Sequence, residues 1–345
     1  MNGQREVIDF LCNPRSHGPG PGVVERIDTH GSLIVLYGDR AYKLKRAVTY
    51  ASLDFRSLAS RARACRAELA LNRRTAPTLY LGVSAITRQA DGRLAFDGPG
   101  SVLDWVVVMR RFPQEALFDR MAGAGTLAMD LAEQLGAEIA RFHNSADRLP
   151  EHGGVEGIRL AIEENHRELL GHPDLLPSAP VQALYRASLQ ALDRQADCLE
   201  QRRRDGRVRR CHGDLRLANI CLFEGRPTLF DGIEFSERLN CIDVLYDLSF
   251  VLMDLHFRQL PRHAEQLLAR YRAQRDEAED CQPLPLFFAL RAALRAFTLA
   301  GSAKRQSEPR IARLKARQAR SLLRLARVSL ELPPLRLTQA RQRQC

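Results

Sequence analysis

The sequence predicts an α+β fold with two lobes: a small N-terminal lobe made of an antiparallel sheet and one helix, and a larger, mainly helical C-terminal lobe. Three observations support this prediction. With 345 residues, 45% of them hydrophobic, the chain is long enough for two lobes with cores of their own. Up to residue 109, short apolar segments alternate with turn residues, which is typical of antiparallel strands. Beyond residue 114, apolar residues recur at helical spacing over longer segments.

The N-terminal lobe is predicted to span residues 23–109, after a Gly- and Pro-rich leader at 1–22 that we expect to be mobile. Its strands are expected at residues 23–28, 32–37, 40–45, 80–87, 92–96 and 102–109. Its helix is expected to run from an N-cap at Asp54 to about Arg74, because apolar or small residues repeat at helical spacing at Leu58, Ala62, Cys65, Leu69 and Asn72. Glu68 lies at the flank of this stripe, from where it can reach a neighbouring strand.

The third predicted strand carries two lysines. Period-2 alternation places Lys43 and Lys45 on the face opposite Tyr42 and Leu44. A lysine on a strand is most often solvated, so a specific role for either lysine depends on an acidic partner.

The C-terminal lobe is predicted to span residues 114–330, after a hinge at 110–113. Its helices are expected at residues 127–142, twice within 155–205, and at 236–255, 284–299 and 307–330. His143 ends the first of these, and we interpret it as a core or capping histidine. We expect residues 331–345 to form a disordered tail.

Cysteine usage and hydropathy indicate a cytoplasmic protein. None of the eight cysteines forms a Cys-x-x-Cys pair, and the N-terminus lacks the basic and apolar regions of a signal peptide. We therefore expect reduced thiols. No uninterrupted apolar run approaches the ~20 residues of a membrane helix, since Asp104 interrupts even residues 102–109. A membrane partner is not expected.

The net charge of +11 is concentrated at the C-terminal end of the chain, where residues 301–345 contain twelve Lys and Arg against two Glu. A solvated helix face and a nucleic-acid surface both fit this pattern. No aromatic residue lies between the arginines, so stacking platforms for single strands are missing from the segment. We favour the solvated face, which makes a nucleic-acid partner unlikely.

The most informative stretch is Cys-His-Gly-Asp-Leu-Arg-Leu-Ala-Asn at residues 211–219, followed twelve residues later by Asp-Gly at 231–232. It combines a carboxylate at Asp214, an amide at Asn219 and a second carboxylate at Asp231. Phosphoryl transfer from a metal-bound nucleotide needs these functional groups: one carboxylate orients the acceptor hydroxyl, while amide and carboxylate oxygens hold magnesium. Asp214 is the candidate base or orienter, and Asn219 and Asp231 are the candidate Mg²⁺ ligands.

At these residues the chain resembles the aminoglycoside phosphotransferase and choline kinase branch of the protein-kinase-like superfamily, in which His-Gly-Asp replaces His-Arg-Asp. Ala-Tyr-Lys at residues 41–43 resembles the kinase Ala-x-Lys, and Glu68 lies where the lysine's partner is expected. The resemblance covers roughly residues 20–330. It implies a bilobal protein-kinase-like fold, with ATP and Mg²⁺ bound in the cleft between the lobes.

The resemblance also implies roles for individual residues. Arg216 is expected to act as a charge clamp on the transferred phosphate, and Asp247 to hold the backbone of the loop at 212–219. The turn at 29–32 lies where kinases carry a phosphate-covering Gly-rich loop, with one glycine in place of three. The expected nucleotide-binding residues are thus Lys43, Glu68, Thr29, Gly31, Ser32 and, at the adenine edge, Met109 and Arg111. For Glu234 and Asp243, the ligand, brace and surface roles stay open.

The leading functional hypothesis is an ATP-dependent phosphotransferase that moves the γ-phosphate to a hydroxyl of a small molecule. The alternative is a pseudokinase or nucleotide-binding regulatory module without turnover, which the missing Gly-rich pattern favours. The resemblance is nearest to an uncharacterised subgroup often joined to a P-loop kinase domain. Because this sequence contains no Gly-x4-Gly-Lys-Ser/Thr, a separate P-loop kinase is a candidate partner.

The acceptor is open at this stage, with sugars, amino alcohols, nucleosides and protein hydroxyls all compatible. The polycationic aminoglycosides call for a dense acidic pocket, and the acids near residue 163 are suggestive. The basic C-terminal end of the sequence supplies no acidic cluster, which argues against an aminoglycoside.

Overall fold

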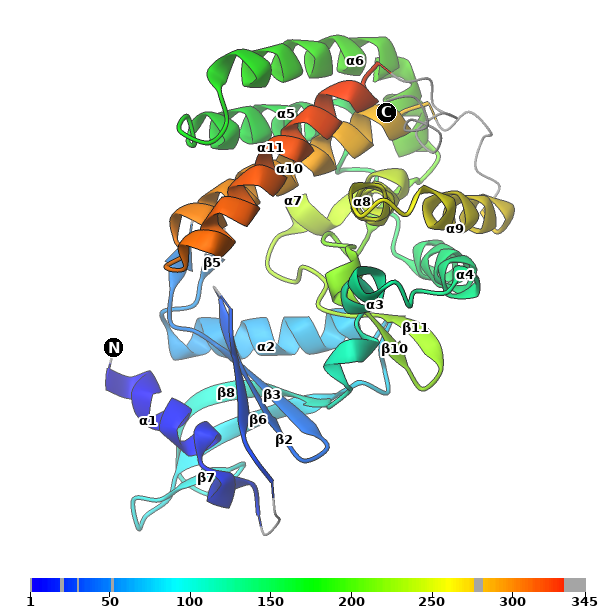
Figure 1. The fold of residues 1–345 in the computed structure, drawn as a ribbon. Coiled ribbons are helices and arrows are strands. Elements are labelled where there is room, and N and C mark those ends of the chain that lie inside the picture. Colours follow the sequence, from blue (N-terminus) through cyan, green and yellow to red (C-terminus); the bar gives the residue numbers. More distant parts are fainter. Residues whose placement is uncertain (1, 19–21, 30, 51–52, 276–281, 332–345) are drawn as a thin grey trace. The chain divides into compact units, whose positions relative to one another are not determined.

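In the computed structural model the chain forms two compact units, which consist of Met1–Leu117 with Asn219–Glu237, and Phe118–Ala218 with Arg238–Cys345. The structure describes residues 2–18, 22–29, 31–50, 53–275 and 282–331. The α+β class is confirmed, because the first unit holds an antiparallel sheet and the second is mostly helical (Figure 1). The sequence places everything after residue 113 in the second lobe, whereas the structure groups Asn219–Glu237 with the sheet.

The sheet of the first unit has six strands in the order β1-β2-β3-β8-β6-β7, and neighbouring strands are antiparallel. The strands are β1 Glu25–Asp28, β2 Ser32–Tyr37, β3 Arg40–Lys45, β6 Tyr80–Arg88, β7 Leu94–Phe96 and β8 Ser101–Arg110. Each lies within two residues of its predicted bounds. Lys43 is in a central strand, opposite Ile34 of β2 and Val107 of β8.

Alternating side chains of the sheet pack against two different helices, α2 Leu58–Asn72 and α1 Asn2–Cys12 (Figure 1). Leu36 belongs to the cluster that contains Cys65 of α2, whereas Leu33 belongs to the cluster that contains Val7 of α1. Leu44 also packs on the α1 side. This alternation turns the lysines of β3 toward α2, as the period-2 pattern predicts.

Helix α1 lies where the sequence analysis expects a mobile leader, and this expectation is therefore wrong for residues 2–17. Val7 and Leu11 are completely buried, and each such burial is worth about 1.5–3 kcal/mol. Gln4 donates hydrogen bonds to the Lys45 carbonyl and to Asp104, both at 2.8 Å. The 3₁₀ turn Pro14–His17 follows α1. Most of the Gly and Pro residues that suggested mobility follow this helix in the sequence.

Helix α2 begins later than the sequence indicates. Its N-cap is Ser57, whose side chain accepts a hydrogen bond from the Ser60 amide, while Asp54 ends the short strand β5. Asp54 instead accepts from Arg56 at 3.0 Å. The prediction of Asp54 as the N-cap is therefore wrong: Ser57 is also a favoured N-cap residue type, and its side chain is the one that accepts the hydrogen bond of the helix amide.

Two further pairs of strands complete the first unit. The pairs are β4 Thr49–Tyr50 with β5 Leu53–Asp54, and β10 Ile220–Phe223 with β11 Arg226–Leu229. Glu224 and Gly225 join β10 to β11, and both have positive φ, as a two-residue hairpin turn of type I′ requires.

The second unit consists mainly of eight helices in its described residues. They are α3 Phe118–Ala124, α4 Met129–Ser145, α5 Gly154–Leu170, α6 Ser178–Arg204, α8 Val244–Phe257, α9 Pro261–Ala273, α10 Leu284–Lys304 and α11 Pro309–Ser329. A short helix, α7 Glu237–Asn240, lies at the point where the chain re-enters this unit. Strand β9 Val208–Arg210 pairs with β12 Cys241–Asp243, so the predicted continuous helix at 236–255 is interrupted by a strand.

Helix α10 is long and apolar enough to cross a membrane by length and composition alone, with a mean hydropathy of 1.4. In this structure 61% of the 18-residue apolar stretch of α10 is buried inside the protein, and α10 packs against α11, α8 and α5 (Figure 1). Core helices of soluble proteins have the same properties. Here α10 forms the centre of the second unit.

Helix α11 presents its arginines to solvent, as we interpreted the basic segment. Ala319 and Leu322 are buried, while Arg313, Arg317 and Arg320 are exposed. The predicted tail lies outside the described residues from 332 onward.

Candidate active site

The first unit holds a buried ion-pair cluster around Glu68. Lys43 Nζ lies 2.7 Å from Glu68 Oε1 and also binds Asp231. Glu68 is completely buried, and Lys43 is 7% exposed. Burial alone lowers the pKa of Lys43, but the carboxylates of Asp231 and Glu68 outweigh it and raise that pKa well above its ordinary value. The structure thus brings together three of the residues that the sequence selects.

Lys45 belongs to the same cluster, although the sequence analysis assigned a nucleotide-binding role only to Lys43. Its Nζ lies 2.5 Å from Glu68 Oε2 and 2.5 Å from Glu234 Oε1. Burial raises the pKa of Glu68, but the two lysines overcome this and lower it. Burial and the neighbouring Glu68 carboxylate raise the pKa of Glu234 despite its contact with Lys45. Glu234 therefore braces the cluster, and only its position three residues after Asp231 hinted at this.

The backbone at Asp231 is held in a left-handed conformation, with φ of 60°. The Asp231 amide donates to the Tyr80 hydroxyl at 3.1 Å, and the next amide, of Gly232, donates to Asn72 Oδ1 at 2.8 Å. A non-glycine residue in this region costs of order 1–3 kcal/mol and persists only where its surroundings fix it. The Asp231 side chain remains 43% exposed. Its carboxylate is therefore fixed in position and accessible.

Asn219 precedes strand β10, and its backbone pairs with Phe230, the residue before Asp231. Its carbonyl accepts a hydrogen bond from the amide of Phe230 at 3.0 Å, and Asn219 itself is 6% exposed. An amide oxygen and an accessible carboxylate are hard ligands of the kind that Mg²⁺ prefers. Asn219 and Asp231 have the ligand chemistry for a magnesium ion, and their role as its ligands stays a prediction.

The second unit carries the loop that contains Asp214, and Asp247 of α8 holds its backbone. The amides of His212 and Gly213 donate to the two Asp247 oxygens at 3.0 and 2.9 Å. Burial raises the pKa of Asp247, but the hydrogen bond and charge of His143 prevail and bring that pKa to about 2. Gly213 has φ of 84°, which explains a glycine at this position. The predicted bracing role of Asp247 matches this geometry.

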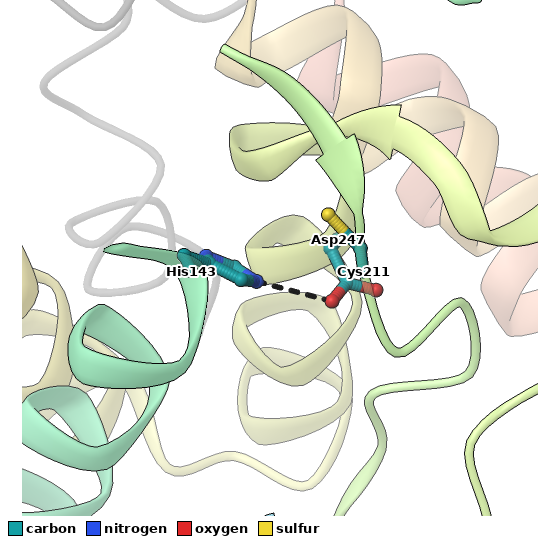
Figure 2. Close-up of side chains that lie close together, drawn as sticks. All are labelled: His143, Cys211 and Asp247. Carbon is teal, nitrogen blue, oxygen red and sulfur yellow. Dashed lines mark hydrogen bonds and ion pairs between the residues drawn. The ribbon is translucent and has the colours of Figure 1, made fainter. Parts of the chain in front are cut away.

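His143 supports Asp247 from the other side. Figure 2 shows the His143 ring pointing at Asp247, with Cys211 beside it. His143 Nε2 lies 3.1 Å from Asp247 Oδ2, and Nδ1 lies 2.9 Å from the Tyr271 hydroxyl. Ligand atoms of His143, Cys211 and Asp247 lie within 4.8 Å of one another, but the histidine nitrogens and the carboxylate oxygens are all engaged in hydrogen bonds. This is a structural brace, in agreement with the core role expected for His143.

Asp214 is bound by Arg216 through two parallel hydrogen bonds, of 2.7 and 2.9 Å. Burial raises the pKa of Asp214, but the charge and hydrogen bonds of Arg216 overcome it and lower that pKa. The structure therefore places Arg216 on the carboxylate that the sequence assigns as base. A carboxylate held ionised in this way accepts a proton weakly and is suited mainly to orienting a hydroxyl.

Asp254 is a second brace of this loop that sequence reasoning missed. Its Oδ2 accepts from the Leu217 amide at 3.1 Å, and its Oδ1 accepts from Arg258 Nε at 3.0 Å. Asp254 lies seven residues after Asp247, which is two turns along the same face of α8. An acidic residue repeated at this interval in an otherwise apolar helix was the available signal.

In the predicted phosphate-covering turn, the hydroxyl of Thr29 is used to close the turn itself. Thr29 Oγ1 donates to the Ser32 carbonyl at 2.9 Å and accepts from the Ser32 amide at 3.0 Å. Ser32 is 6% exposed, and the Gly31 carbonyl accepts from the Arg46 amide at 2.8 Å. The structure thus gives Thr29 and Ser32 turn-forming contacts. Residue 30 lies outside the described residues.

In the predicted adenine-binding segment, two backbone amides already have partners. The Arg110 amide donates to the Leu79 carbonyl, and the Arg111 amide donates to the Asp39 carbonyl at 2.7 Å. The Arg111 side chain pairs with Glu25 at 2.5 Å. Met109 is 8% exposed and packs in the core on the α2 side. Neither of these two amides is therefore available to an adenine ring.

Residues 37–281 match the sequence model of the phosphotransferase enzyme family, and the chain belongs to this family. The match covers both the Lys43–Glu68 pair and the loop that carries Asp214. The resemblance stated from the motifs is therefore confirmed, and so is the class of protein: a kinase-like phosphotransferase.

Uncharacterized proteins of Mycobacterium tuberculosis and Mycobacterium bovis are 30% identical to this chain over 273 residues. The aligned region covers 78% of this chain and 53% of each relative, so the chain spans about half the length of these relatives.

Solved structures share the fold at low sequence identity. A choline/ethanolamine kinase family protein from Mesorhizobium loti has a TM-score of 0.54 and 15% identity, with 97% of both chains covered. The GDP complex of aminoglycoside 2′-phosphotransferase-IIIa has a TM-score of 0.52 and 13% identity, with 95% of this chain and 99% of that chain covered. At such identities the similarity concerns the fold.

Proposed function

We propose that this protein is an ATP-dependent phosphotransferase that transfers the γ-phosphate to a hydroxyl group of a small molecule. The observation that carries the proposal is the buried Lys43–Glu68 pair, joined to Asp231 in the same cluster. A lysine kept charged by two carboxylates, one of them accessible, is the arrangement that phosphoryl transfer uses to hold nucleotide phosphates. Family membership and the GDP complex of a fold relative support nucleotide as the phosphate donor.

Some of these residues act on the phosphate donor, and Asp214 acts on the phosphate acceptor. Lys43 binds phosphate oxygens, and Glu68 and Lys45 fix its position. Asn219 and Asp231 would hold Mg²⁺, which neutralises charge between the β- and γ-phosphates when it is bound. Asp214 orients the acceptor hydroxyl. In the reaction, the bond from the γ-phosphorus to the bridging oxygen breaks, a bond to the acceptor oxygen forms, and the hydroxyl proton passes to Asp214 or to water.

A regulatory module without turnover is the second candidate, because Arg216 engages both oxygens of Asp214. In an enzyme, the acceptor hydroxyl has to bind a lone pair of Asp214 that Arg216 does not occupy, or displace Arg216 from one oxygen. In a binding module the pair would persist. The separate P-loop kinase partner stays a prediction.

Asp214→Asn separates the two candidates. In an enzyme, turnover of Mg-ATP should fall roughly 10²- to 10⁴-fold, because the orienting carboxylate is lost, while the affinity for Mg-ATP stays within about threefold. The measurements are phosphate release and calorimetric titration with Mg-ATP. Asp193→Asn, at an exposed position of α6, is the matched control and should behave like the wild type. A folded wild-type protein that neither binds nor hydrolyses Mg-ATP rules out both candidates, and binding without any turnover leaves only the module.

A further inference from the structure

The second unit contains a cavity of about 310 Å³ at α8, α10 and α11. This volume is at the lower end of the range for small-molecule sites. Its polar wall consists of Asp254, Arg258, Arg295 and Gln318, and part of the remaining wall is apolar, including Leu322. A cavity with a few polar groups on an apolar wall has the composition of a metabolite site.

The cavity is directly connected to the loop that carries Asp214. Asp254, in the cavity wall, accepts the hydrogen bond of the Leu217 amide at 3.1 Å, and Leu217 lies three residues after Asp214. The charge of Arg295 also contributes to lowering the pKa of Asp214. A molecule in this cavity therefore contacts Asp254 and Arg295, the first of which holds the Asp214 loop through the Leu217 amide while the second acts on Asp214 by its charge.

Among the arginines around the cavity, Arg295 differs in its contacts with carboxylates. Asp254 pairs with Arg258 at 3.0 Å, and Asp214 pairs with Arg216 at 2.7 Å. Arg295 has a single hydrogen bond, to Thr298 Oγ1 at 3.4 Å, and no ion pair with any residue in the described part of the chain. Burial, with the nearby charge of Arg216, lowers the pKa of Arg295 to about 10, although the carboxylates of Asp214 and Asp254 act in the opposite direction. A guanidinium with free donors and little solvent is the group that binds carboxylate or phosphate.

We propose that this cavity binds the phosphate acceptor, and that the acceptor is a hydroxylated metabolite with an anionic carboxylate or phosphate group held by Arg295. The inference rests on the proposed function and deepens it. The two guanidinium groups in the wall disfavour a polycationic acceptor. The acids of α5 that suggested such an acceptor do not line the cavity, and Glu164 among them pairs with Arg238 at 2.5 Å.

The test uses hexopyranose derivatives that differ mainly in charge: D-glucuronate, D-glucose 6-phosphate, neutral D-glucose and cationic D-glucosamine. Each is titrated into the full chain by calorimetry, with and without a saturating non-hydrolysable Mg-ATP analogue that occupies the nucleotide site. At least one anion should bind roughly 10- to 100-fold more tightly than glucose and glucosamine, as expected for charge-assisted hydrogen bonds. Comparison of the two anions distinguishes a carboxylate from a phosphate preference.

Arg295→Gln should abolish the preference for the anion, and Arg295→Lys should retain part of it, because the charge remains while the planar fork is lost. The matched control is Arg320→Gln, at an exposed position of α11, which should leave the preference unchanged. Gln318→Glu adds a negative charge to the cavity wall and should weaken anion binding by roughly tenfold. It tests the site independently if Arg295→Gln proves unstable.

The inference is overturned if glucose or glucosamine binds as tightly as the anions, if neither anion binds, or if Arg295→Gln preserves the preference. If the protein turns over Mg-ATP under any of these outcomes, the proposed function stands and only the acceptor class is wrong. Anion binding that depends on Arg295 in a protein that does not bind Mg-ATP overturns the acceptor assignment together with the proposed function.

Discussion

Asp247→Asn tests how the loop at Asp214 is held. The carboxylate of Asp247 is completely buried and accepts hydrogen bonds from the amides of His212 and Gly213, with His143 as a third partner. An asparagine in the same place has one acceptor oxygen, and its NH₂ group must face either a backbone N–H or the histidine ring. Leaving one buried donor unsatisfied costs about 1–3 kcal/mol, and losing the charge weakens the bonds that remain.

The pKa gives a second measure of the same interaction. A change in the pKa of Asp247 from 3.8 to about 2 corresponds to roughly 2 kcal/mol of stability at neutral pH. Because the pKa is lower in the folded state, this contribution is complete above pH 3.8 and is lost as the pH falls toward 2. The cost of the unsatisfied donor and the lowered pKa of Asp247 both predict that Asp247→Asn lowers the free energy of unfolding at pH 7 by about 2–3 kcal/mol.

The assay is urea unfolding followed by far-UV circular dichroism, which reports the helices of the second unit, between pH 7 and pH 3. Fluorescence is less suitable, since the chain's single tryptophan, Trp105, lies in β8 of the first unit. Hydrogen exchange of the His212 and Gly213 amides should accelerate in the variant. An unfolding free energy within 0.5 kcal/mol of the wild type at pH 7 would refute the assignment of Asp247 as a brace. So would a difference that does not shrink toward acidic pH.

Three further predictions concern other parts of the molecule. Gly213→Ala should lower the free energy of unfolding by about 1–2 kcal/mol, because residue 213 has a positive φ. Gly157→Ala should raise the free energy of unfolding by about 0.5–1 kcal/mol, because Gly157 lies within α5 with open space around it. Equal effects of the two substitutions in urea unfolding would contradict the backbone argument. A double-mutant cycle of Lys43→Met and Glu68→Gln, followed by Trp105 fluorescence, should give a coupling energy above about 1 kcal/mol, and additive effects would show that the pair is not coupled. Burial raises the pKa of Cys65 to about 12, so iodoacetamide at pH 8 should leave this thiol unmodified until urea unfolds the protein, and rapid labelling of the native protein on peptide mapping would contradict its burial.

The sequence by itself determined the elements whose signals are local. The bounds of the six strands in the main sheet came within two residues, because alternation and turn residues act over a few positions. The order of Lys43, Glu68, Asp214, Asn219 and Asp231 was sufficient to indicate the family, because kinase-like phosphotransferases place their phosphate-binding, metal-binding and orienting groups in this order along the chain.

Contacts between residues far apart in the chain were decided only by the tertiary structure. Glu68 forms ion pairs with Lys45 as well as Lys43, and Lys45 also pairs with Glu234, which lies 189 residues further along the chain. The packing of α1 on the sheet and the Leu217–Asp254 hydrogen bond are also contacts between residues far apart in the chain. Spacing along a chain fixes which residues share a face of one element. It does not fix which faces meet, because that choice depends on how the buried apolar surfaces of all the elements pack together.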